Sequence, residues 1–179
     1  MKIKYNSPII LTYSIISISV LALCSNSMML TYFSSPAHLS FLNPLFYLRS
    51  ISYIAGHGNW AHLLGNLMII LLVGPLLEEK YGSVKLLEMI IVTAVVTAVL
   101  NAFLFSASLV GGSGIAFMLI LLGSFSNIKS REIPLTFILI SVLYIGSEVV
   151  ATLKIDNISQ FSHLAGGFIG AMYGFIRTR

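Results

Sequence analysis

Six apolar stretches fill most of this 179-residue chain, and they constrain its fold more than any other feature. Hydropathy places them at 8–24, 60–77, 84–105, 113–127, 133–152 and 159–176. Only 9% of the residues are charged, against about 25% in a soluble domain, so much of the apolar surface must face lipid. The sequence predicts an all-α integral membrane protein, a bundle of six transmembrane helices that forms a single domain over residues 1–179.

The charged residues mark the ends of these stretches. The ten basic residues include no run of three, which argues against nucleic acid as a partner. If the N-terminus is cytoplasmic, eight of the ten lie on the inner side, and only Arg49 and Lys154 lie outside. We therefore expect a multi-pass protein of the cell membrane with both termini in the cytoplasm.

The connection before the second stretch and the start of the fourth stretch are unusual. The long connection, 25–59, is rich in Pro, Ser and aromatic residues, which predicts a partly helical extracytoplasmic loop in the membrane interface. The fourth stretch, 113–127, has 15 residues, roughly 22 Å of helix against about 30 Å of hydrocarbon. Its outer end should begin inside the bilayer, where the irregular backbone of 110–114 requires surrounding protein or a water-filled cavity.

Four polar side chains within the stretches share one depth. Helical rise from the inner boundary puts His62 and Ser113 at roughly 24 Å, His163 near 21 Å and Asn66 at about 18 Å. A serine hydroxyl becomes a nucleophile when a base takes its proton, and Ser113 and His163 can form that pair. Attack on an amide creates an oxyanion, for which His62, Asn66 and backbone N–H groups at the start of the Ser113 helix are suitable donors.

Glycines of the sixth stretch offer a way to bring the pair together. Gly166, Gly170 and Gly174 recur every fourth residue, a spacing that lets a neighbouring helix approach closely. If that neighbour is the fourth stretch, Ser113 and His163 meet at matching depth.

Three motifs resemble those of the rhomboid intramembrane serine proteases. They are His57-x4-His62-x3-Asn66, Gly111-x-Ser113-Gly114 and His163-x2-Gly166-x3-Gly170. Their order and spacing agree with the family from about Arg49 to the C-terminus. The resemblance implies an endopeptidase that cuts transmembrane segments of other membrane proteins through a Ser113–His163 dyad. It further implies oxyanion stabilisation by His62 and Asn66, and no metal or organic cofactor.

The resemblance also implies secondary roles. Positions that could support the site are His57, Gly111, Gly114 and Phe117; structural positions are Arg49, Glu78, Gly82, Gly166 and Gly170. Phe117 stands where family members often have a tyrosine stacked on the catalytic histidine, and Tyr53 stands where some have a further histidine. Both departures leave the dyad intact and the substrate preference open.

The sequence leaves several alternatives open. The same fold could bind transmembrane segments without cleaving them, or His62 and His163 could ligate haem. His62 and Asn66 could instead hydrogen-bond the first loop, and His57, near the outer interface, fits a wetted structural histidine. Glu148 could orient His163, yet it lies near the outer interface and is kept out of the catalytic set. The natural substrate, the pathway, the oligomeric state and the helix that gates substrate entry also stay open.

Overall fold

The structure, a computed structural model, describes residues 6–125 and 158–177 together with positions 135, 138–139, 142–143 and 146. The regular elements of this part of the chain are all helical, which confirms the all-α prediction. In chain order they are α1 (Pro8–Leu23), α2 (Asn26–Tyr32), α3 (Pro44–Ser52), the 3-10 helix η1 (Tyr53–Ala55), α4 (Trp60–Tyr81), α5 (Ser83–Leu104), α6 (Ser113–Phe125) and α8 (Ile158–Arg177). Most of the predicted fifth stretch, 133–152, and with it Glu148, lies outside the described residues.

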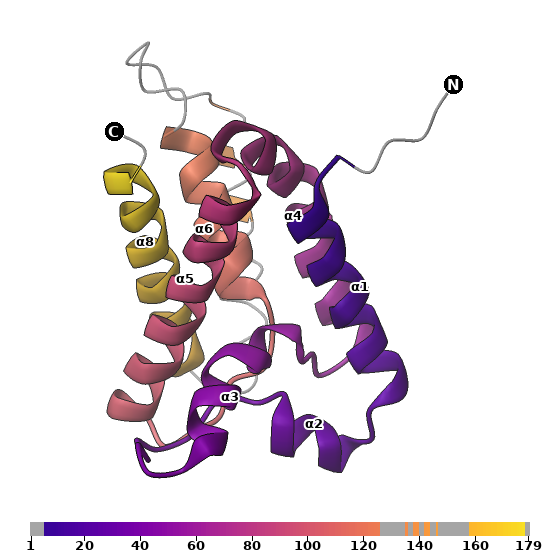
Figure 1. Cartoon of the computed structure of the whole chain (residues 1–179), viewed down its shortest axis with the longest axis vertical. Helices are drawn as coiled ribbons and strands as arrows, with labels where there is room; N and C mark the ends of the chain where they lie inside the picture. The colour runs from indigo at the N-terminus through magenta and orange to yellow at the C-terminus, as the bar shows by residue number, and fades with distance from the viewer. Residues whose placement is uncertain are drawn as a thin grey trace.

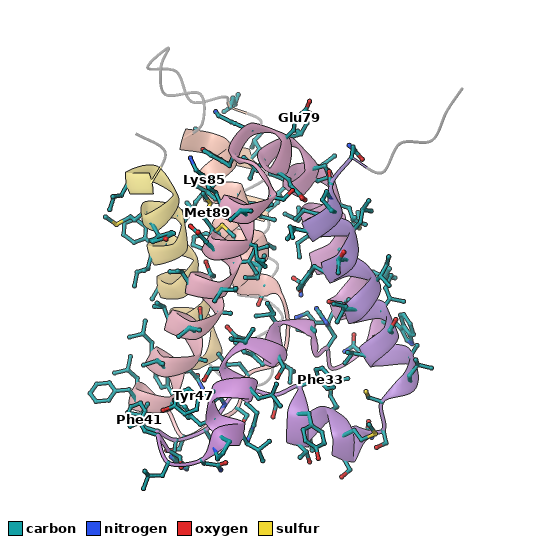
Figure 2. The ribbon with its side chains drawn as sticks, in the orientation of Figure 1. Phe33, Phe41, Tyr47, Glu79, Lys85 and Met89 are labelled. Carbon is teal, nitrogen blue, oxygen red and sulfur yellow. The ribbon has the colours of Figure 1, made fainter. Side chains whose placement is uncertain are left out.

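The long helices α1, α4, α5, α6 and α8 stand side by side, and the short helices α2 and α3 lie at one end of them (Figure 1). The start of α1 and the end of α8 lie at the opposite end. Glu79 and Lys85 mark that end, whereas the aromatic side chains Phe41 and Tyr47 lie beside α3 (Figure 2). Helix α6 packs against both α4 and α8, so the helix that begins with Ser113 lies between the two that carry the other predicted site residues.

Helices α4 and α5, with 22 residues each, are long and apolar enough to cross a bilayer. On α4, large apolar side chains that are 56–72% exposed recur every fourth residue. They are Leu64, Met68, Leu72 and Leu76. Because this spacing follows one face of a helix, the stripe is typical of a surface that faces lipid. The opposite face of α4 buries Asn66 and Glu78.

The first loop, which contains α2, α3 and η1, is fastened to the segment before α6. Arg49 of α3 donates from Nε to Ser34 O and from Nη2 to Ser35 O, both at 2.8 Å. Ser35 and Leu109 exchange two hydrogen bonds: the Ser35 N–H donates to Leu109 O, and the Leu109 N–H donates to Ser35 Oγ, each at 2.8 Å. Arg49 therefore fixes residues Ser34 and Ser35 of the first loop. Ser35 in turn fixes Leu109, which lies four residues before Ser113.

Glu78, in the last turn of α4, caps the start of α1. Its two carboxylate oxygens accept from the N–H groups of Ile9 (3.0 Å) and Ile10 (3.1 Å), and Ser83 Oγ donates to Oε1 at 2.7 Å. The first N–H groups of a helix have no partner within it, and the helix dipole favours a negative charge there. Gly82 makes the reversal into α5 with φ 82°, a conformation that glycine adopts without steric conflict.

The glycines of α8 pack mainly against α5. A Cβ on Gly166 would collide with Thr97 Oγ1, and one on Gly170 would collide with Thr93 Oγ1. The sequence considered the fourth stretch as the neighbour of this face; α6 does pack against α8, but Gly166 faces α5, and Gly170 faces both α5 and Met118 of α6. Glycine spacing indicates that some helix approaches closely, but it does not identify which one. In this structure Thr93 and Thr97 of α5 pack directly against the two glycines.

Candidate active site

The residues just before α6 form an irregular segment that is buried in the protein. Gly111 has φ 126°, a conformation that residues with a Cβ rarely adopt. Its N–H donates to Tyr53 O (3.1 Å), and the N–H of Gly112 donates to His57 Nε2 (3.4 Å). Because both N–H groups are used within the protein, neither is left to bind an oxyanion.

The side chains of His62 and Asn66 reach this segment from α4. A Cβ on Gly111 would lie 2.7 Å from Cε1 and 3.0 Å from Nε2 of His62, and 3.7 Å from Nδ2 of Asn66. The two polar side chains, one helical turn apart, thus converge on a residue two positions before Ser113. This explains why Gly111 must be glycine, since a side chain would displace the His62 ring.

Gly112 is covered from α1. A Cβ on Gly112 would collide with the hydroxyl of Tyr13, which donates to Ile54 O at 2.7 Å. Protein side chains thus enclose both glycines, as expected for irregular backbone at this level, whereas the water-filled cavity also expected there stays a prediction.

His57 is buried rather than wetted, and the expectation of a solvated interface histidine was wrong. Its side chain is 1% exposed, and it lies in the loop between η1 and α4. Nδ1 lies 3.3 Å from Ala55 O, and Nε2 lies 3.2 Å from Asn66 Nδ2. These partners and Gly112 lie on η1, on α4 and in the segment before α6, so the sequence position beside the interface did not reveal the burial. Burial, aided by the neighbouring His62 ring, lowers the pKa of His57 to about 4, so the imidazole is neutral near pH 7.

Ser113 opens α6 and is 4% exposed. At this level the first turn of α6 contacts α8: a Cβ on Gly167 would lie 2.6 Å from Phe117 Cδ1 and 3.1 Å from Gly114 O. Gly167 is one helical turn after His163, whose backbone belongs to α8 and whose side chain lies outside the described residues. The helices that carry the two predicted dyad residues are therefore in contact beside Ser113.

The described part of the site offers a buried hydroxyl, with the nitrogen-bearing side chains of His62 and Asn66 close to the backbone that precedes it. Within the described part of the chain, no three His, Cys, Asp or Glu side chains form a group that could hold a metal ion. The haem alternative needs the side chain of His163 as its second ligand, and that side chain lies outside the described residues.

Sequence reasoning missed three residues that build the site. Tyr13 covers Gly112, Tyr53 accepts the Gly111 N–H, and Ser35 fixes Leu109. Two of these contacts use backbone atoms as donor or acceptor, and all three join positions far apart in the chain. A side-chain pattern in one sequence carries no signal for such contacts.

Comparison with known proteins identifies the family that this sequence matches. A model of the rhomboid domain matches residues 45–179. The Rhomboid protease GlpG of Haemophilus influenzae is 24% identical over 134 residues, which are 73% of this chain and 70% of the relative.

Two eukaryotic proteins match a similar region. Rhomboid-like protein 15 of Arabidopsis thaliana is 30% identical over 71% of this chain, and Rhomboid-related protein 1 of Caenorhabditis elegans is 26% identical over 72%. The match spans only 36% and 39% of these two longer proteins.

Proposed function

The chain belongs to the rhomboid family of membrane-embedded proteins, and on that premise we propose that it is an intramembrane serine endopeptidase. Ser113 is the nucleophile and His163 is the general base. The observation that carries the proposal is the convergence of His62 and Asn66 on Gly111, two residues before a buried serine at a helix start. A purely structural serine has no need of such neighbours.

The mechanism follows from these positions. Ser113 Oγ attacks the scissile carbonyl carbon while His163 accepts the hydroxyl proton. The oxyanion that forms is stabilised by N–H groups from the side chains of His62 and Asn66. His163 then gives its proton to the leaving amine, and water hydrolyses the acyl-enzyme to restore the serine.

The substrates are transmembrane segments of other proteins, cut near their outer ends. A regular helix hides its amides in internal hydrogen bonds, so the cleaved segment carries small or helix-breaking residues that let it unwind. The chain lies in the cell membrane with both ends in the cytoplasm, and water enters the site from the opposite side beneath the first loop. The reaction requires no metal or organic cofactor.

The alternative is a non-catalytic rhomboid-like protein that binds transmembrane segments. The retained Ser113 and His163 favour the protease, because a binding protein has no use for a nucleophile and a base at the same depth. The two functions differ in one measurable respect, which is whether a bound segment leaves the protein in one piece or two.

A cleavage assay tests the proposal. Wild-type protein is reconstituted into vesicles with a reporter that carries one transmembrane segment with helix-breaking residues, and fragments are followed by gel and mass spectrometry. We expect cleavage by wild type and none by Ser113→Ala or His163→Ala, each with an unchanged melting temperature. Ser106→Ala, at an exposed serine of the same connection, is the matched control and should cleave normally. Cleavage retained by Ser113→Ala would overturn the proposal.

A further inference from the structure

We propose that His57 is a positioning residue that holds the groups around Ser113 in place through a fixed Nδ1–H tautomer. The inference rests on the proposed function, since the rate it affects is that of the Ser113 reaction. His57 contacts Asn66 and His62 of α4 and the Gly112 N–H, so one side chain links α4 to the segment before α6.

The hydrogen bonds of the imidazole determine its tautomer. Nδ1 lies 3.3 Å from Ala55 O, and a carbonyl oxygen can only accept, so Nδ1 carries the proton. Nε2 is therefore a lone-pair acceptor. Its two neighbours are both donors, namely Asn66 Nδ2 at 3.2 Å and the Gly112 N–H at 3.4 Å. All three contacts are satisfied by this single tautomer and by neither the other tautomer nor the imidazolium.

This tautomer also orients the amide of Asn66. Because Nε2 has no proton to give, the NH₂ group of Asn66, rather than its oxygen, must face His57. The same NH₂ group lies 3.7 Å from the Cβ position of Gly111, so it is held over the segment that leads to Ser113. An amide that rotated by 180° would present its oxygen there, and an oxygen would repel the oxyanion that we expect Asn66 to stabilise.

His57 fixes two further groups. Its ring meets the ring of His62 edge to face, with centroids 5.2 Å apart and an interplanar angle of 68°. Its bond to the Gly112 N–H anchors the backbone one residue before the nucleophile. Because misplacing a reacting group by 1 Å can cost about 100-fold in rate, loss of this anchor should reduce turnover more than substrate binding.

Three substitutions separate positioning from space filling. His57→Phe keeps most of the volume but accepts no hydrogen bond, and His57→Ala loses both. His57→Gln supplies a side-chain oxygen about where Nε2 lies, so it can accept from Asn66 and Gly112. We expect kcat to fall about 10- to 100-fold in the Ala and Phe variants with KM little changed, and to recover largely in the Gln variant. His38→Phe, at an exposed loop histidine, is the control.

A spectroscopic measurement tests the tautomer without turnover. Long-range ¹H–¹⁵N spectra of ¹⁵N-histidine-labelled Ser113→Ala protein in detergent, assigned by comparison with Ser113→Ala/His57→Gln, should show the Nδ1–H form for His57. An Nε2–H form, or a fully active His57→Phe beside an inactive Ser113→Ala, would overturn the role of His57 alone. Cleavage retained by Ser113→Ala would overturn the proposed function and the rate effect of His57 with it.

Discussion

Two clusters of buried polar groups include residues of α4, one near each end of that helix. The Glu78 cluster consists of Glu78, Ser83 and the first turn of α1, and its carboxylate, 3% exposed, binds two N–H groups and a hydroxyl. The His57 cluster consists of His57, His62, Asn66 and Gly112, and it surrounds the backbone that leads to Ser113. Both are buried and both follow family motifs, but of the two only the His57 cluster surrounds the start of the helix that begins with Ser113, the proposed nucleophile.

The comparison teaches that a buried polar cluster does not by itself identify an active site. A carboxylate that satisfies a helix N-terminus ties two helices together, whereas neutral donors beside a hydroxyl can stabilise a developing charge. Changes to the Glu78 cluster should therefore alter stability alone, whereas changes to the His57 cluster should also alter turnover.

The largest stability effect should come from the Glu78 cluster. Glu78→Ala leaves the N–H groups of Ile9 and Ile10 without their acceptor, and we expect a loss of about 3–5 kcal/mol. Thermal unfolding in detergent measures the loss, and turnover per folded molecule should stay normal. Glu79→Ala, at the exposed neighbour, should change stability by less than about 0.5 kcal/mol. Normal stability with lost turnover in Glu78→Ala would erase the distinction between the clusters.

Acid should destabilise the His57 cluster by a slightly smaller amount. The pKa of His57 is about 4 in the folded protein, so the unfolded chain, with a pKa of about 6.5, takes up the proton first as the pH falls. Stability from this group is complete above pH 6.5 and is lost between pH 6.5 and 4, by up to about 3 kcal/mol. Melting curves of Ser113→Ala and Ser113→Ala/His57→Gln across this range isolate the contribution, and parallel pH dependences would contradict it.

A methyl group on Gly112 should disturb both folding and turnover. Gly112→Ala collides with the Tyr13 hydroxyl, and overpacking of this kind costs about 1–3 kcal/mol. Adding Tyr13→Phe removes the colliding oxygen and should recover part of the stability. Gly58→Ala, where a Cβ meets nothing within 4 Å, is the matched control. A fully stable and active Gly112→Ala would show that the close fit around the segment has no function.

The smallest effect should come from the α6–α8 contact. Gly167→Ala pushes against Phe117 and Gly114 O, and because the Phe117 ring can shift, we expect a loss of only about 1 kcal/mol. We expect turnover to fall even though most of the stability is kept, because the added methyl group separates α6 from α8 beside Ser113. Gly65→Ala, on an open face of α4, should leave both unchanged or raise stability slightly. Normal turnover in Gly167→Ala would remove the need for close helix contact at this level.

Local patterns in the sequence predicted the helices well. The bounds of α1 and α5 differ from the predicted apolar stretches by no more than one residue at each end, because hydropathy and helix length are properties of neighbouring residues. The start of α6 at Ser113 and the buried glycines before it also followed from local counting. Depth, counted along each helix, placed His62, Asn66 and Ser113 at one level without any knowledge of contacts.

Tertiary partners could not be predicted in the same way. Glu78 and Ile10 are 68 residues apart, and nothing in the sequence pairs a carboxylate with a particular helix start. The burial of His57 depends on contacts with Asn66 and Gly112, which lie on other segments. The four-residue glycine spacing of α8 does not tell which helix faces Gly166. These contacts depend on how the helices assemble, which a single sequence does not encode locally.

The central claim is that Ser113 is chemically activated, and labelling with a fluorophosphonate probe tests it most directly because no substrate is needed. Wild type and Ser106→Ala, folded in detergent, should be labelled on Ser113 as read by peptide mass spectrometry, whereas Ser113→Ala and His163→Ala should not be labelled. Equal labelling of wild type and Ser113→Ala, or a folded wild type that takes no label, would contradict the claim.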